Sequence, residues 1–251
     1  MSPRLFLPFF GLAIALSFAR AQETKQMTAE QLVDKTIEAK GGAKAIKALE
    51  SVKLTGKMLV NQGKMEFKVT EIKKQPDSVR EEFTLQGMTM VQSFDGKNGW
   101  KISPFQGRKD PEKMSADETK SLVEDAEIVG PLVDLKEKGS QVEYLGTEDV
   151  DGTQAHKLKV TRKNGDVNYV YLDPDYFLEI RILSQRTEHG AQVETETDLS
   201  DYEKVNGVYL PMSIESGRKG GSNKQKIIFD EAKGNVPVDE ATFEFPANPA
   251  K

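Results

Sequence analysis

Apolar and polar residues alternate with a period of two along most of the chain, from about residue 52 to residue 245. Val208, Leu210 and Met212, for example, are separated by single residues on the same parity. Strict alternation predicts strands with one buried and one exposed face, and the short Gly-containing turns between segments predict antiparallel connections. We count about eleven such strands, which predicts one large, mainly β domain.

Two helices are expected before the first strand. Thr28 followed by Gln31 resembles a capping box that begins an amphipathic helix, and Gly41-Gly42 ends it. A shorter helix is expected from about residue 43 to residue 49. The predicted sheet therefore begins behind a helical N-terminal segment.

In mid-chain the period changes to about 3.6 residues, between Pro104 and Gly139. The pattern predicts a helical insert over residues 105–138: a helix from Ser115 to Val129, and a short second helix after Pro131. We expect the insert to cover the sheet as a movable lid. The apolar residues that would face the sheet are Leu122, Val123, Ala126, Val129, Leu132 and Leu135.

The first 21 residues resemble a secretory signal peptide. Arg4 precedes an apolar stretch over residues 5–18, and Ala19-Arg20-Ala21 is a small-x-small cleavage site. An uncleaved anchor is the alternative, but the apolar stretch is short for a span of about 20 residues. We therefore expect cleavage after Ala21, export to the periplasm, and one mature domain over residues 22–251. The absence of cysteine excludes lipidation of an N-terminal Cys and any disulfide.

Charge and motifs disfavour several classes of function. The formal net charge of −5 at pH 7 disfavours nucleic-acid binding. His156 and His189 are the two histidines, and no metalloprotease, hydrolase or phosphate-loop motif is present. We therefore expect no enzyme activity, no metal site and no cofactor.

Methionine and aromatic residues are frequent on the face of the strands that we expect to be buried. Methionine suits surfaces that accept varied apolar shapes, so this face could line a ligand cavity. An ordinary packed core gives the same periodicity, and both interpretations remain open, including for Trp100. The candidate cavity residues are Met58, Met65, Phe67, Phe83, Met88, Met90, Trp100, Leu158, Tyr169, Tyr171, Ile180 and Met212.

Short motifs spaced along the whole mature chain carry a resemblance to a known family. They are Ala39-Lys40-Gly41-Gly42 with Ile46 and Leu49, Leu54-Thr55-Gly56, Asp95-Gly96 with Gly99-Trp100, Gly130-Pro131-Leu132, Tyr144-Leu145-Gly146, Asp151-Gly152 with Lys157-Leu158, Tyr171-Leu172-Asp173, and Gly207-Val208-Tyr209-Leu210-Pro211. In this order they resemble the periplasmic LolA-like carriers that sort outer-membrane lipoproteins, as a divergent member.

The resemblance implies an incomplete antiparallel β-barrel of about eleven strands, with its concave face covered by the N-terminal helix and the insert. It also implies a monomer whose cavity holds acyl chains of lipoproteins or other lipids for transfer toward the outer membrane. Transfer proteins of the inner and outer membranes would be its partners. The same fold also serves lipid- or peptide-sensing envelope regulators, and a non-binding structural domain is a third possibility.

Overall fold

The computed structural model describes residues 27–188 and 190–246. The expected signal peptide, with its cleavage site after Ala21, lies outside the described residues, as does His189. No helix within the described part of the chain is long and apolar enough to cross a membrane.

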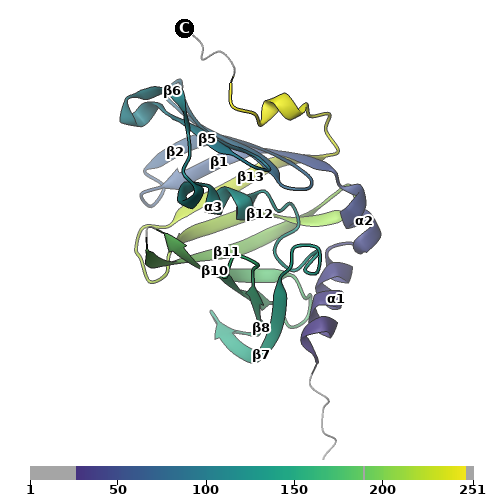
Figure 1. Cartoon of the computed structure of the whole chain (residues 1–251). Coiled ribbons are helices and arrows are strands. Elements are labelled where there is room, and N and C mark those ends of the chain that lie inside the picture. Colours follow the sequence, from purple (N-terminus) through teal and green to yellow (C-terminus); the bar gives the residue numbers. More distant parts are fainter. Residues whose placement is uncertain (1–26, 189, 247–251) are drawn as a thin grey trace, which may run out of the picture.

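The described residues form one antiparallel sheet of thirteen strands (Figure 1). Consecutive strands are neighbours, except that β1 also pairs with β13 and so joins the two halves of the sheet. The sheet ends at β6 and β7, which are not paired with each other, so it stays open. The strands are β1 Ser51–Val60, β2 Met65–Lys74, β3 Ser78–Leu85, β4 Met88–Asp95, β5 Gly99–Ser103, β6 Arg108–Lys113, β7 Gln141–Val150, β8 Thr153–Thr161, β9 Val167–Leu172, β10 Glu179–Glu188, β11 Ala191–Val205, β12 Val208–Arg218 and β13 Gln225–Gly234. The open antiparallel sheet is confirmed, with more strands than the eleven expected.

The N-terminal helices are confirmed as α1 (Ala29–Ala39) and α2 (Ala43–Ala48). Both halves of the Thr28–Gln31 capping box form, and Gly41 leaves the helix with φ of +119°. The apolar side of α1 packs on strands β8 and β9. The contacting cluster contains Ala29, Leu32, Val33, Leu132, Leu158, Val160, Val170 and Leu172.

The insert is only partly helical, which corrects the expectation for residues 105–138. It contains a 3₁₀ turn, η1 (Pro104–Gln106), then strand β6, then one α-helix, α3 (Ala116–Asp125). The second helix expected after Pro131 does not form, and residues 126–140 make turns. Gly130 (φ +82°) and Asp134 (φ +56°) take left-handed conformations there, which interrupt a right-handed helix.

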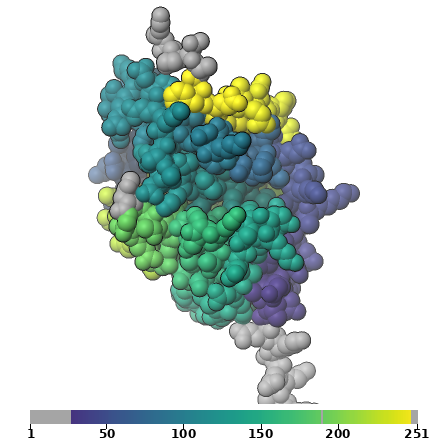
Figure 2. Space-filling model, viewed as in Figure 1, coloured from purple at the N-terminus to yellow at the C-terminus, as the bar shows by residue number. Residues whose placement is uncertain are grey.

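The insert covers one face of the sheet (Figures 1 and 2). Leu122 and Ala126 pack on Val79 and Phe94 of β3 and β4. Val129 and Val133 join a larger core that contains Leu54, Met58, Phe67, Phe83, Leu210, Met212 and Phe229. We call this the insert side of the sheet.

The C-terminal segment covers part of the opposite face. It includes the 3₁₀ turn η2 (Glu240–Thr242) and the fully buried Phe243. Trp100 Nε1 donates a hydrogen bond of 2.7 Å to the Phe243 carbonyl oxygen, and Ser93 Oγ donates to the same oxygen at 3.1 Å. Both faces of the β3–β5 region are therefore buried, by different parts of the chain.

Candidate functional site: a cavity under the insert

A cavity of about 180 Å³, here the inner cavity, lies between the sheet and residues 124–131 of the insert. Alternation along the strands brings apolar side chains from both halves of the sheet to this one face. Its apolar wall contains Val52 and Leu54 of β1, Ile182 of β10, Leu199 of β11, Leu210 and Ile214 of β12, and Phe229 of β13.

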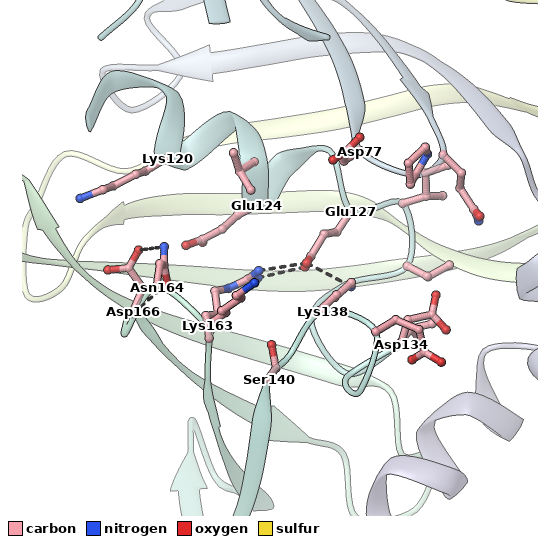
Figure 3. A pocket seen from close by; sticks show the side chains of 18 residues that line it. Asp77, Lys120, Glu124, Glu127, Asp134, Lys138, Ser140, Lys163, Asn164 and Asp166 are labelled. Carbon is pink, nitrogen blue, oxygen red and sulfur yellow. Dashed lines mark hydrogen bonds and ion pairs between the residues drawn. The ribbon is translucent and has the colours of Figure 1, made fainter. Parts of the chain in front are cut away.

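A second space of about 470 Å³, here the outer pocket, opens beside the same part of the insert (Figure 3). Its walls are the β2–β3 turn, residues 120–140 of the chain and the β8–β9 turn. Five residues line both spaces and form the boundary between them. These are Glu124, Glu127, Ile128, Val129 and Arg162.

Lys40 fastens the insert to α1 and to the sheet. Its Nζ atom lies 2.8 Å from Glu179 Oε2 on β10 and donates a 2.7 Å hydrogen bond to the Val129 carbonyl oxygen. The two charged side chains are only 4% and 1% exposed. A Cβ atom at the adjacent Gly130 would lie 3.3 Å from Glu179 Oε1, so glycine lets the insert pass close over the pair. One buried ion pair therefore joins three elements.

A second ion-pair cluster closes the boundary between the two spaces (Figure 3). Arg162, just after β8, holds the Glu127 carboxylate through two hydrogen bonds of 2.9 Å each, and Lys138 Nζ lies 3.0 Å from Glu127 Oε1. Loss of hydration opposes ionisation of Glu127, but the hydrogen bonds and charge of Arg162 outweigh it and lower its pKa. Glu127 is therefore ionised and fixed at neutral pH.

Acidic side chains surround the end of α3 nearest the sheet. Lys73 pairs with Glu71 at 2.9 Å, and Asp125 is exposed to the inner cavity beside them. Loss of hydration among these residues raises the pKa of Asp125 to about 7 and the pKa of Glu81 well above its usual value. The charge of this wall therefore changes near neutral pH. No group of three or more His, Asp or Glu residues in the described ranges is placed to hold a metal ion.

Three residues that line the inner cavity each carry a buried polar atom with no hydrogen-bond partner among the described residues. These atoms are Arg162 Nε, Asn168 Oδ1 and Glu179 Oε1. Leaving such an atom unpaired costs about 1–3 kcal/mol, so buried unpaired groups in native proteins usually contact water, an ion or a ligand. The inner cavity thus combines an apolar wall with unused hydrogen-bonding capacity.

None of the twelve predicted cavity residues lines the inner cavity or the outer pocket. Six lie on the insert side of the sheet: Met58, Phe67, Phe83, Met90 and Met212 in the large core, and Leu158 under α1. Met65 and Met88 lie at hairpin ends and are 38% and 41% exposed. These eight residues pack in the core or at the sheet margin.

The remaining four predicted cavity residues lie on the opposite face. Tyr169, Tyr171 and Ile180 cluster with Leu183, whereas Val170, between the two tyrosines, packs under α1. Trp100 lies under the C-terminal segment. Alternation placed both tyrosines on one face correctly, but the opposite face also carries a buried apolar cluster. A register shift between Glu179 and Arg181 separates Ile180 from the face of Ile182.

The predicted lid residues mostly face the sheet. Leu122, Ala126, Val129 and Leu132 are buried, Leu135 packs against the cluster under α1, and Val123 is 40% exposed in the outer pocket. Movement of the insert stays a prediction.

Charged and polar residues of the site escaped the sequence analysis. Asn168 and Arg162 did carry a readable signal, because Asn168 shares a parity with Val170 and Arg162 shares one with Leu158. A polar residue in an otherwise apolar series marks a position where the buried face of a strand contacts polar groups or a cavity. Glu179 had no such signal, because the register shift beside it breaks the alternation.

His156 packs and hydrogen-bonds with neighbouring aromatic side chains. Its Nδ1 atom lies 2.9 Å from the Tyr144 hydroxyl, and its ring stacks on Phe177 at 6.0 Å between ring centroids. Neither the inner cavity nor the outer pocket includes it.

Comparison with known proteins identifies the fold. No protein-family model matches the sequence, and no curated protein matches it. A LolA superfamily protein from Nitrosomonas europaea is 11% identical and matches with a TM-score of 0.59 over 87% of this chain and 98% of its own. A DUF1329 family protein from Desulfovibrio piger is 14% identical, with a TM-score of 0.59 over 86% and 97% of the two chains.

A candidate outer membrane lipoprotein-sorting protein domain from Vibrio parahaemolyticus is also similar. It is 14% identical and has a TM-score of 0.53 over 84% of this chain and 97% of its own. At this identity the likeness concerns the fold, which each of these structures shares over nearly its whole length. The chain therefore shares its open antiparallel fold with these three structures, which is the fold that the sequence resemblance implied.

Proposed function

We propose that this protein is a periplasmic carrier that holds acyl chains of lipoproteins or other lipids between the sheet and the insert. The supporting observation is the inner cavity, which has an apolar wall and lies under a segment that is not part of the sheet. The similarity of the fold to a lipoprotein-sorting domain favours the same function. Transfer proteins of the two membranes would supply and receive the cargo, and the carrier would act as a monomer without catalysis.

The size of the inner cavity requires that the insert move. Pockets that enclose drug-sized ligands measure about 300–1,000 Å³, whereas this cavity measures about 180 Å³. Loading a long acyl chain therefore needs residues 124–131 to withdraw from the sheet, which would join the inner cavity to the outer pocket. Moving the acyl chain from water into the cavity is worth about 0.8 kcal/mol per CH₂. That gain can offset the contacts that opening breaks.

A crosslink tests this requirement. A Cβ atom added at Gly99 on β5 would lie 2.9 Å from Thr119 Cγ2 on α3. The natural sequence contains no cysteine, so two introduced cysteines could pair only with each other. The Gly99→Cys/Thr119→Cys variant should form a disulfide that holds α3 on the sheet. We expect the oxidised protein to lose uptake of a fluorescent acyl probe and the reduced protein to recover it. Equal uptake in both forms would contradict a movement of the insert that carries α3 with it.

A matched pair of substitutions tests the location of the ligand. Leu199→Trp fills the inner cavity, whereas Leu145→Trp adds the same group at a 47% exposed position outside both spaces. Only the first should reduce probe uptake. Native mass spectrometry of the protein purified from the periplasm would then identify the bound lipid. No lipid and no probe uptake would favour a structural domain, and a stable protein partner without lipid transfer would favour a sensor.

A further inference from the structure

Arg162 occupies the point where the inner cavity meets the outer pocket. It follows β8 directly, and its backbone N–H donates to the Asp166 carbonyl oxygen at 2.8 Å, which fixes it at the base of the β8–β9 turn. Its side chain is 12% exposed and lines both spaces. The guanidinium is therefore part of the boundary that separates the two spaces.

The guanidinium now binds an oxyanion that belongs to the insert. Both oxygens of Glu127 accept from Arg162, each at 2.9 Å, and Lys138 adds a third contact at 3.0 Å (Figure 3). This parallel, two-bond geometry is the one with which arginine recognises free carboxylates and phosphates. Glu127 lies two residues after the end of α3, in the segment that the proposed function moves. When that segment withdraws, the guanidinium loses its oxyanion while it stays on the sheet.

Hydrogen-bonding capacity remains at this point even with Glu127 in place. Arg162 Nε has no partner among the described residues, and neither has Oδ1 of Asn168, which is 2% exposed. Both residues line the inner cavity. A headgroup with more oxygens than a carboxylate, such as a phosphate, has an acceptor for Nε, and a hydroxyl has a donor for Asn168.

The acidic neighbours of Arg162 have partners of their own. Glu124 lies 3.2 Å from Arg186 and accepts from Ser184 at 3.0 Å. Asp166 accepts a 2.7 Å hydrogen bond from the Asn164 side chain. Glu124 belongs to the segment that withdraws and leaves with Glu127, whereas Asp166 keeps its contact with Asn164. The withdrawal therefore leaves Arg162 without its bidentate partner. The two N–H groups of the Arg162 guanidinium that bound Glu127 are then free to bind an incoming anion.

We propose that Arg162 is the headgroup site for a single-chain amphiphile that ends in an oxyanion, either a carboxylate or a phosphate. The acyl chain lies in the inner cavity and the head takes the place of Glu127, whose carboxylate acts as an internal substitute while the carrier is empty. This assignment rests on the proposed carrier function and specifies its ligand class.

Two substitutions that break the same ion pair separate a headgroup site from a simple latch. Glu127→Gln removes the internal oxyanion and leaves the guanidinium, whereas Arg162→Gln removes the guanidinium. Both should loosen the insert alike. The mature full-length variants would be titrated with hexadecanoic acid, its methyl ester and hexadecyl phosphate, in competition with a fluorescent acyl probe.

We expect the unmodified protein to prefer the acid over the ester. Glu127→Gln should increase that preference by about tenfold, because the anion no longer competes with the internal carboxylate. Arg162→Gln should abolish the preference for the acid while ester binding persists. Arg162→Lys keeps the positive charge but cannot make the two parallel hydrogen bonds, so it should retain part of the preference. Whichever of the acid and the phosphate binds more tightly identifies the headgroup.

Equal changes in acid and ester affinity in both glutamine variants would overturn the headgroup site and leave the carrier function standing. Absence of binding for all three probes, in variants that melt as cooperatively as the unmodified protein, would overturn both. If Arg162→Gln does not fold, Arg162→Lys compared with Glu127→Gln decides the question by the same ratio.

Discussion

Replacing Lys40 by methionine tests whether a buried ion pair holds the insert on the sheet. The substitution keeps the length of the side chain but removes the countercharge of Glu179 and the hydrogen bond to the Val129 carbonyl oxygen. Glu179 is 1% exposed, and the Tyr202 hydroxyl, which would remain, makes only a long hydrogen bond of 3.4 Å to Oε2. The carboxylate would therefore remain buried without compensation.

The structure indicates a large effect. Breaking a buried ion pair by removing one partner costs about 3–5 kcal/mol. A domain of this kind is typically stable by about 5–15 kcal/mol, so the loss is a substantial part of the total. With a urea dependence of about 2–3 kcal/mol per molar, the unfolding midpoint should fall by about 1–2.5 M.

Urea unfolding gives the global loss, and hydrogen exchange locates it. Lys40 binds the Val129 carbonyl oxygen, so we expect faster exchange in the segment that begins there, residues 129–135, and unchanged exchange in the central strands. The double variant Lys40→Met/Glu179→Gln is the control, because it removes the stranded charge and should recover part of the lost stability. A loss below about 1 kcal/mol for Lys40→Met, or fully additive losses in the double variant, would refute the reasoning.

Three further predictions follow from other parts of the structure. Loss of hydration beside Glu71 and Glu124 raises the pKa of Asp125 from 3.8 to about 7, so the folded protein retains a proton that the unfolded chain releases. Stability should therefore fall as pH rises from about 4 to about 7, and Asp125→Asn should flatten the melting temperature over that window. Gly130→Ala should lower the free energy of unfolding by about 1–2 kcal/mol, because φ is +82° there and Glu179 Oε1 lies 3.3 Å from the added carbon; an unchanged denaturation curve would contradict this. Trp100 lies on the face opposite the insert, so its emission should stay constant during acyl loading and shift only on unfolding; a shift on loading would place it near the ligand.

Period-two alternation was enough to predict a large antiparallel sheet, because a strand with one buried face imposes that pattern locally. That the sheet stays open was implied by the family resemblance. The N-terminal helices were equally local, since the Thr28–Gln31 capping box and the glycines at positions 41 and 42 fix their ends within a few residues of chain. The resemblance to the LolA-like family implied this fold, and the similar solved structures confirm the fold.

The insert shows the limit of local pattern. The period over residues 115–125 correctly indicated α3, but Arg108–Lys113 became an edge strand and residues 126–140 became turns. Pairing with β5 decided the first difference, and the left-handed residues Gly130 and Asp134 account for the second. Neither strand pairing nor a left-handed backbone conformation can be read from the spacing of apolar residues.

The sequence by itself determined which residues alternate, where the helices before the sheet begin and end, and which side chains are apolar. Only the tertiary structure decided which face each alternating series occupies, because both faces of this sheet carry buried clusters and a register shift beside Glu179 exchanges them. It also decided the site, since Lys40 meets Glu179 and Glu127 meets Arg162 across 139 and 35 positions of chain. Such contacts come from the curvature of the sheet and the path of the insert over it, which no local spacing of residues encodes.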